Sequence, residues 1–366
     1  MAYFRVGIRR IPQIRACVRA EIRFFFFSLY HRIFILKALV SSSLELNVTP
    51  LATTLCHKVT VRMNYIKILK SKVLGDDPAE KIRSVLPVSE SQFSCDPSEC
   101  HTSFKESCFT LKGADASAPL YESAKPVDLH ILVSTGKTDW EHDAFEEKGT
   151  ILNLVNRESG KLAETCGINV KSNVTNDALD FSDPDSLSLN KLKVLLLPWF
   201  VSINGITKDN IEEIFDIIKT IVSDENNKGA EAVVLEEKLK NMNGVNVSKC
   251  SNGSYVLLCS HRTRDKRCGI TAPIMKKEFD SQLRDIDLYR DPGDDRPDGV
   301  KVLFVNHVGG HKFAANVLIY NKHGEFVWFA RCTPLNVKFM IEETVLGHKV
   351  NAEHVRACAH FQEIKW

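Results

Sequence analysis

The sequence of 366 residues lacks the short motifs that mark several large classes of enzyme. It contains no P-loop, no glycine pattern of a dinucleotide-binding fold and no G-x-S-x-G around a nucleophilic serine. It also contains no C-x-x-C pair, which weighs against a disulfide oxidoreductase. The sequence therefore contains no motif that would indicate nucleotide binding, hydrolysis by a serine nucleophile or dithiol exchange.

Neither charge nor hydrophobicity is in large excess. The 48 basic and 46 acidic residues give a net charge of +2, too balanced for a protein that binds nucleic acid by neutralising phosphates. The longest apolar run, residues 24–40, is interrupted by His31, Arg32 and Lys37. It falls short of the ~18 apolar residues that a membrane span needs, so we expect no nucleic-acid partner and no membrane span.

The charge is unevenly distributed along the chain. Residues 1–62 hold ten Arg or Lys but only Glu21 and Glu45, a net charge of +8. We expect this basic leader to be unstructured or not translated, with Met63 as the true start. We expect the protein to be cytoplasmic, and a further nuclear location stays open. The alternatives are a helix on a membrane surface and a cleaved transit peptide, which would place the protein in the mitochondrial matrix.

The rest of the chain divides by composition into three parts. We expect an irregular arm over 63–126, an α/β domain over 127–248 and a second α/β domain over 249–366 with a C-terminal tail. Residues 226–248, rich in Asn, Glu, Lys and Gly, are predicted to lie between the domains. The predicted strands are 127–133, 193–200, 254–260, 300–305, 317–320 and 325–330. The predicted helices are 150–165, one capped by Thr207, one with Pro273 in its first turn, and 333–346.

These elements predict an α/β fold with buried strands covered by helices. In the second domain the order β-α-β-β-β-α is typical of a thioredoxin-like arrangement. Because one fold hosts many functions, that order predicts no chemistry.

Four candidate metal ligands lie in the second domain, at strand ends or in the loops that follow. Cys259 and Cys268 form C-x8-C, and His307 and His311 form H-x-G-G-H. The loop between the cysteines carries a net charge of +3, which favours thiolate over thiol. Eleven cysteines, an odd number in a chain too long to need disulfide staples, suit a reducing compartment and thiols or metal ligands.

Spacing alone leaves the identity of the metal open. Two thiolates and two imidazoles suit tetrahedral zinc, but zinc sites usually place cysteines two to four residues apart. A [2Fe–2S] cluster with both cysteines on one iron and both histidines on the other fits the ligand count equally well. The third alternative is that no metal binds.

The two motifs together, with LYRD at 288–291, TDWEHDA at 138–144 and the terminal Trp366, resemble the sucrase/ferredoxin-like family over 63–366. This resemblance implies a divergent thioredoxin-like domain followed by a thioredoxin-like ferredoxin domain. It also implies a bis-histidinyl [2Fe–2S] cluster, with Cys259 and Cys268 on the iron that stays ferric and His307 and His311 on the reducible iron. A role in redox homeostasis and a link to actin patch distribution follow from the same resemblance.

Three functions compete on this evidence. The first is a one-electron carrier whose neutral imidazole ligands raise the reduction potential and couple electron uptake to proton uptake. The second is a zinc-structured, non-redox binding module. The third is an enzyme that reduces a quinone or a peroxide. We favour an electron-transfer protein over an enzyme and assign no catalytic residue, and the redox donor and acceptor stay unidentified.

The resemblance also gives the tail a partner. Family members end in a similar aromatic tail that the cytosolic iron–sulfur assembly targeting complex reads, so we expect Trp366 to recruit that complex. The alternative is that Trp366 packs back on its own domain.

Several other residues have a simpler explanation than catalysis. We expect Asp139, His142 and Asp143 to cap a helix or to lie in a loop through which the domains contact each other. His261 is expected to support the metal ligands, and Cys332 to pack in the core. Arg331 is expected either to form a structural ion pair or to contact the site or a partner.

Overall fold

The computed structural model describes residues 77–109, 118–291, 293–294, 296–310 and 312–364. The basic leader, Met63, His311 and Trp366, on which several expectations depend, lie outside these residues. Within them, no helix combines the length and the apolar character that crossing a bilayer requires.

The fold is mixed α/β, as predicted, and its described strands join in one sheet of 11 strands. The order across the sheet is β11-β10-β9-β6-β8-β2-β1-β3-β4-β5, and β7 pairs with β8. The first five strands along the chain and their helices form what we call the N-terminal half. The last six strands and their helices form the C-terminal half.

The N-terminal half begins with the fully buried strand β1, whose apolar sequence explains its place in the centre of this half. Helix α4 follows, capped by the Thr150 hydroxyl, which accepts a hydrogen bond from Asn153 N, and ended by Gly167 in the left-handed conformation. The strands are β1 (Leu129–Ser134), β2 (Val170–Thr175), β3 (Leu192–Leu197), β4 (Val201–Ile206) and β5 (Asn246–Lys249). The helices are α4 (Ile151–Cys166), α5 (Pro184–Leu187), α6 (Ile211–Ser223) and α7 (Glu231–Leu239).

The C-terminal half centres on another fully buried strand, β6, which pairs in parallel with β8 and antiparallel with β9. The strands are β6 (Ser254–Cys259), β7 (Tyr289–Arg290), β8 (Val300–Val305), β9 (Val317–Asn321), β10 (Glu325–Phe329) and β11 (Val355–His360). The helices are α8 (Lys266–Asp285) and α9 (Val337–Phe339), and α9 continues as helical turns over Met340–Leu346.

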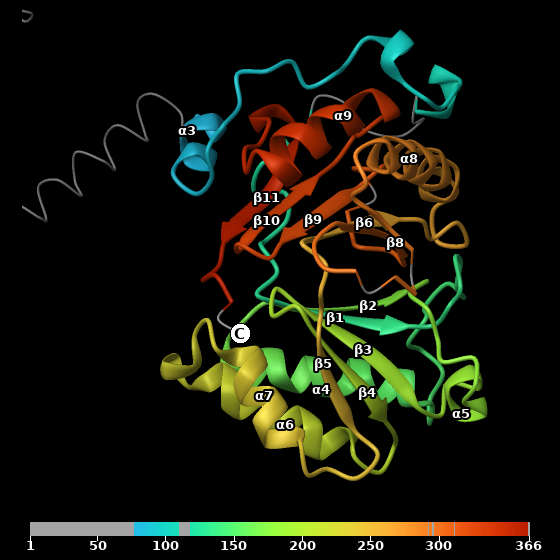
Figure 1. The fold of residues 1–366 in the computed structure, drawn as a ribbon, viewed down its shortest axis with the longest axis vertical. Coiled ribbons are helices and arrows are strands. Elements are labelled where there is room, and N and C mark those ends of the chain that lie inside the picture. The colour runs from blue at the N-terminus through green and yellow to red at the C-terminus, as the bar shows by residue number, and fades with distance from the viewer. Residues whose placement is uncertain (1–76, 110–117, 292, 295, 311, 365–366) are drawn as a thin grey trace, which may run out of the picture. The chain divides into compact units, whose positions relative to one another are not determined.

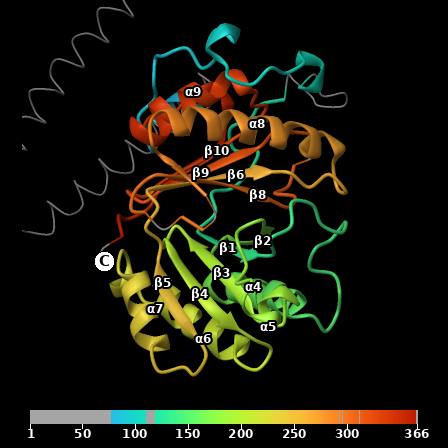
Figure 2. The same ribbon diagram turned by 45° about the vertical axis from the view of Figure 1, so that its right-hand side comes forward.

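The two halves repeat one strand arrangement. In each half, a helix joins the first strand to a parallel neighbour, which lies next to the other half. On its other side the first strand pairs with an antiparallel strand. Two more strands follow from there toward the outer edge of the sheet. β1, β2, β3, β4 and β5 thus correspond to β6, β8, β9, β10 and β11. Figures 1 and 2 show the helices of each half on the side of its strands that faces away from the other half.

The seam between the halves is a single pair of facing residues, Thr175 on β2 and Val305 on β8, with the strands antiparallel. An asparagine follows each: the Asn176 side chain accepts from Phe304 N at 2.7 Å, and the Asn306 side chain accepts from Val174 N at 3.1 Å. These bonds are related by the same repeat. β2 and β8 face each other at only one residue pair, and the two asparagine side chains therefore add hydrogen bonds that lengthen this seam.

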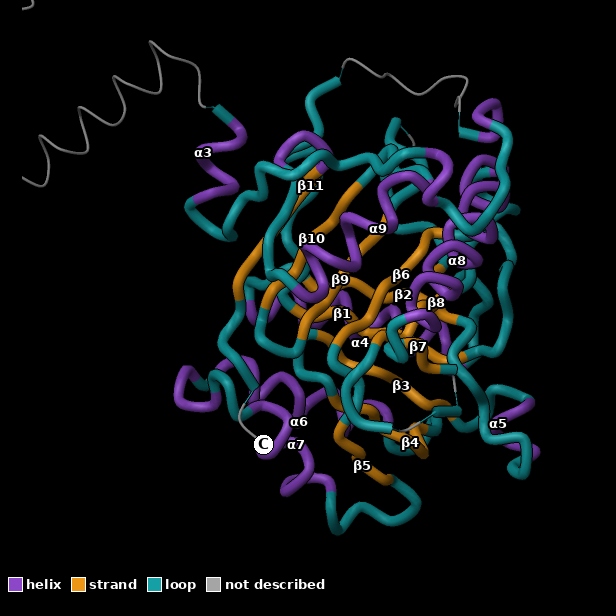
Figure 3. Tube along the Cα trace, turned by 45° about the horizontal axis from the view of Figure 1, so that its top comes forward, coloured by secondary structure: helices purple, strands orange, loops and turns teal. Residues whose placement is uncertain are grey.

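The arm before β1 packs on the helices of the C-terminal half. Its helix α3 spans Pro78–Arg83, and Figure 3 shows the arm as mostly loop around a centre of strands. Phe93 of the arm contacts the rings of Phe329 and Phe339. Glu278, a fully buried carboxylate of α8, accepts from the backbone N–H groups of His101 and Thr102 at 3.0 and 2.7 Å.

The structure corrects three local predictions. The helix expected to start from Thr207 begins at Ile211, with Asn210 at its N-cap. Residues 226–248 are not a bare linker, because they contain α7 and most of β5. Pro273 lies inside α8 rather than in its first turn, because Asp265 caps the helix by accepting from Arg267 N.

Candidate metal centre

Three of the four predicted ligands converge at one edge of the sheet. Cys259 is the last residue of β6, and His307 lies two residues beyond the end of β8. Because β6 and β8 run parallel, their carboxyl ends lie side by side. Cys268 was expected in a loop; the early start of α8 places it instead in the first turn of that helix.

The two thiols are buried and interact with each other. Hydrogen bonds from Cys268, from His307 and from Val308 N hold the pKa of the Cys259 thiol well below its usual value, against the opposing effect of burial. The same bond to Cys259, together with burial, raises the pKa of Cys268. Of the two thiols, Cys259 is therefore the first to give up its proton, and Cys268 keeps its own.

The H-x-G-G-H loop is built on glycines. Gly309 and Gly310 adopt φ values of +101° and +78°, a region that side chains disfavour. A Cβ on Gly310 would lie 2.5 Å from the Arg356 guanidinium, so this approach requires glycine. His311 itself is outside the described residues, and within them no cluster of three or more His, Cys, Asp or Glu is arranged to hold a metal ion.

His261 supports the site, in line with its expected role. Its ring is buried, accepts a hydrogen bond from His307 N at 3.2 Å and contacts the carbonyls of Trp140 and Glu141 at 3.1 and 2.9 Å. It therefore ties the backbone of a candidate ligand to the 138–144 segment.

The 138–144 segment is a contact loop between the halves, as expected. The Asp139 carboxylate accepts from the Thr263 hydroxyl at 3.0 Å, and His142 lies 3.0 Å from Arg264. Cys332 is buried, also as expected. Arg331 donates to the Ala118 carbonyl at 2.8 Å.

Besides His307, Cys259 interacts electrostatically with two cations that the sequence analysis did not identify. Of the basic residues between the cysteines, Arg267 pairs with Asp265 at 2.8 Å. Burial lowers the pKa of Lys171 on β2 to about 8 and that of Arg356 on β11 to about 10, and in both cases the charge of the Cys259 thiolate acts in the opposite direction. β2 and β11 were not predicted, so neither residue carried a signal in the sequence.

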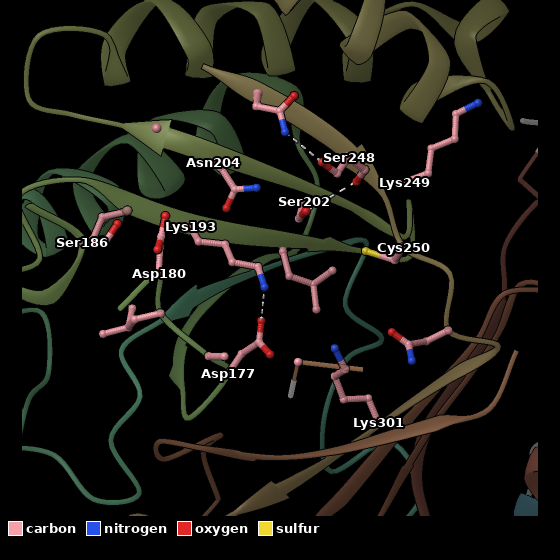
Figure 4. A pocket seen from close by; sticks show the side chains of 18 of the residues that line it. Asp177, Asp180, Ser186, Lys193, Ser202, Asn204, Ser248, Lys249, Cys250 and Lys301 are labelled. Atoms are coloured by element: carbon pink, nitrogen blue, oxygen red, sulfur yellow. Dashed lines mark hydrogen bonds and ion pairs between the residues drawn. The ribbon is translucent and has the colours of Figure 1, made fainter. Parts of the chain in front are cut away.

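The N-terminal half has a counterpart of this site without metal ligands. By the repeat, Ser134 corresponds to Cys259 and Asp177 to His307. Asp177 is buried and pairs with Lys193 at 2.8 Å (Figure 4). A cavity of about 780 Å³ opens beside this pair, and Cys259, Cys268 and His307 are not among the residues that line it. Cys250 lines this cavity but no histidine does, so of the two copies only the C-terminal one combines two cysteines with an imidazole.

The donor set suits a thiophilic metal group. Two buried sulfurs, one able to remain a thiolate, and an imidazole are ligands that zinc and iron–sulfur clusters accept, and hard cations prefer oxygen. With His311 four residues beyond His307, the set would contain two thiolates and two imidazoles.

Known proteins match this chain over most of its length. The sucrase/ferredoxin-like family matches residues 120–357. Actin patches distal protein 1 of Saccharomyces cerevisiae is 35% identical over 324 residues, which cover 82% of this chain and 99% of that protein. Altered inheritance of mitochondria protein 32 of Meyerozyma guilliermondii is 36% identical over 90 residues, 25% of this chain and 29% of that protein. No solved structure matches. The long family match and the nearly full-length relative show that the chain belongs to the sucrase/ferredoxin-like family.

Proposed function

We propose that the protein is an electron-transfer protein that holds a [2Fe–2S] cluster with Cys259, Cys268, His307 and His311. The observation that carries this proposal is the meeting of two buried cysteines and His307 from a strand end, a helix start and a loop. When bound, such a cluster accepts and returns one electron. Membership of a ferredoxin-like family supports the same chemistry.

The chain's own residues prepare the site for this task. Val308 N and Ala315 N donate to the sulfurs of Cys259 and Cys268, and such bonds to a ligand sulfur favour its negative charge. Burial of both cysteines keeps water away from the sulfurs. The His261 ring holds the backbone at His307, which limits the freedom of that ligand.

The rest of the proposal follows the resemblance. Cysteine ligands would hold the iron that stays ferric, and histidine ligands the reducible one. The N-terminal half would be a divergent thioredoxin-like domain and the C-terminal half a thioredoxin-like ferredoxin domain. We propose a cytoplasmic protein of redox homeostasis whose role includes actin patch distribution. The name of the Saccharomyces relative supports the last point.

Metal and sulfide analysis of the purified full chain tests the proposal. We expect two iron and two acid-labile sulfide per chain, together with visible absorption. Cys259→Ser and Cys268→Ser should lose both, because serine replaces a thiolate poorly. Cys332→Ser and Cys358→Ser are matched controls, since these cysteines are also buried, and they should keep both.

The second candidate is the zinc-structured, non-redox module, which the tetrahedral ligand count favours. A colourless wild-type protein with one zinc per chain and no sulfide would establish it and would overturn the electron-transfer proposal. Iron and sulfide that persist in Cys259→Ser or Cys268→Ser would show that other residues hold the cluster.

A further inference from the structure

Two cations lie beside Cys259 without a carboxylate partner. Arg356 is 2% exposed, and its guanidinium donates only to neutral acceptors: the Asn316 side chain, the Gly309 carbonyl, and the hydroxyl and carbonyl of Ser123. No ion pair joins Arg356 or Lys171 to a carboxylate of the described residues. A buried cation is costly unless an anion compensates it.

Aromatic rings complete the surroundings of these cations. The Arg356 guanidinium lies 4.6 Å from the centre of the Trp328 ring and 4.8 Å from that of Phe313. The Lys171 ammonium lies 5.7 Å from the centre of the Trp328 ring. Such contacts stabilise a cation by only ~0.5–2 kcal/mol each, which does not replace a full negative charge.

The counterpart in the N-terminal half shows what is missing. By the repeat, Lys171 on β2 corresponds to Lys301 on β8, so each seam strand carries one lysine. Near Lys301, the cations share a cavity with the carboxylate of Asp177, which pairs with Lys193 (Figure 4). Near Lys171, the negatively charged group that interacts with the lysine is the thiolate of Cys259.

We infer that Arg356 and Lys171 supply the positive charge that stabilises the reduced, more negative state of the group held by Cys259, and that Arg356 also positions the H-x-G-G-H loop. This inference rests on the proposed function. Reduction by one electron, which dithionite supplies in the redox titration below, adds one negative charge at the site, and both cations favour that state. Arg356 is the positioning residue, because it binds the Gly309 carbonyl and packs against Gly310.

The experiment is a redox titration of the full chain, followed by visible absorption, for wild type, Lys171→Met and Lys301→Met. Lys301 is the matched control, since it occupies the same place in the other half. For Lys171→Met we expect the equilibrium with a fixed mediator to shift roughly tenfold toward the oxidised form, or about 59 mV for a one-electron couple. Lys301→Met should shift it less than twofold.

The arginine variants separate charge from positioning. Arg356→Gln should shift the equilibrium in the same direction and shorten the lifetime of the visible absorption in the presence of a chelator. Arg356→Lys keeps the charge, so it should hold the potential close to wild type and still shorten that lifetime. Arg290→Gln is the control, because Arg290 is a buried arginine that holds the carbonyls of Asp287 and Tyr289 elsewhere.

The outcomes are distinguishable. Equal potentials for wild type, Lys171→Met and Arg356→Gln, all with normal absorption, would overturn the inference and leave the proposed function intact. A Lys301→Met shift as large as that of Lys171→Met would also overturn it, since a general charge effect would then explain both. A wild-type protein without a cluster would overturn the proposed function and this inference with it. If Arg356→Gln fails to fold, the potentials of Lys171→Met and Lys301→Met still test the effect of charge. The lifetime of the visible absorption in Arg356→Lys then tests the positioning role.

Discussion

His307 contacts the thiol of Cys259, and its replacement tests whether it is a ligand. His307→Cys should keep a cluster but lower its reduction potential and weaken the dependence of that potential on pH. The reason is that an anionic thiolate would replace a neutral, titratable imidazole. Potentiometric titration at several pH values measures both, and His311→Cys should behave in the same way. An unchanged potential and pH slope would show that the histidine is not a ligand.

His130 is a second buried residue with a measurable consequence. It bonds Tyr320 OH and the Asn173 side chain, at 3.0 and 2.9 Å, and burial lowers its pKa to about 3. The unfolded chain takes up a proton near pH 6.5, so this histidine favours folding above that pH and progressively less as the pH falls toward 3. The free energy of unfolding should therefore contain a His130 contribution that is roughly 2 kcal/mol smaller at pH 5 than at pH 7.

Denaturant unfolding of His130→Gln at pH 7 and pH 5 checks this. The variant should lose less stability between the two pH values than wild type, by that amount. Exposed His323→Gln is the control and should follow wild type. If the free energy of unfolding of His130→Gln falls between pH 7 and pH 5 as much as that of wild type, His130 is not the source of this loss of stability.

Among the elements, the strands built from continuous apolar runs could be predicted from sequence, and those with polar positions could not. β1, β3, β6, β8 and the β9–β10 hairpin bury nearly every residue. β2, with the sequence VKSNVT, carries Lys171 and Asn173 toward charges and amides of the other half. Cys259 and Asn306, the partners of these two side chains in the other half, lie far along the chain, so these polar positions have no local explanation.

The candidate site divides in the same way. Cys259, Cys268 and His307 belong to two short motifs, and short spacing is visible in one sequence. Arg356 lies on β11, far along the chain from the residues it serves, and looks like any surface arginine until the sheet is assembled. Pro273 also misled the prediction of α8, because proline is usually found in the first turn and here lies inside the helix.

The contact between the arm and α8 depends on one carboxylate. Glu278→Ala would leave the N–H groups of His101 and Thr102 without their acceptor, at a cost of roughly 2–4 kcal/mol. We expect this variant to unfold at lower denaturant concentration and to be cleaved faster by protease within residues 97–108. Glu237→Ala, at an exposed position of α7, should match wild type in both assays. Unchanged cleavage of the arm would mean that its aromatic contacts hold it alone.

At the scale of the whole molecule, the tail offers a test in cells. The terminal Trp366 lies outside the described residues, and we propose that it recruits the cytosolic iron–sulfur assembly targeting complex. Deletion of Trp366 should leave the thermal stability of the protein nearly unchanged and lower its iron content when it is isolated from cells. Full iron occupancy after deletion, or a collapsed fold, would contradict recruitment by this residue.

The repeat gives the molecule two equivalent places, and among the described residues only the C-terminal place brings two cysteines and a histidine together. In the N-terminal half, Asp177 and Lys193 form an ion pair where the C-terminal half has His307 and the cysteines. The two halves meet through the β2–β8 pair, the asparagines that follow it and the 138–144 loop, and Lys171 on β2 brings its charge to the site from the other half. The N-terminal half is therefore part of the environment of the site.

The most direct test is a redox titration of the purified full-length protein, monitored by visible absorption at several pH values. We predict a coloured protein that bleaches in one one-electron step, with a potential that falls as the pH rises, because histidine ligands give up protons on oxidation. A colourless protein that binds zinc, or absorption that dithionite does not change, would contradict a cluster held by two cysteines and two histidines.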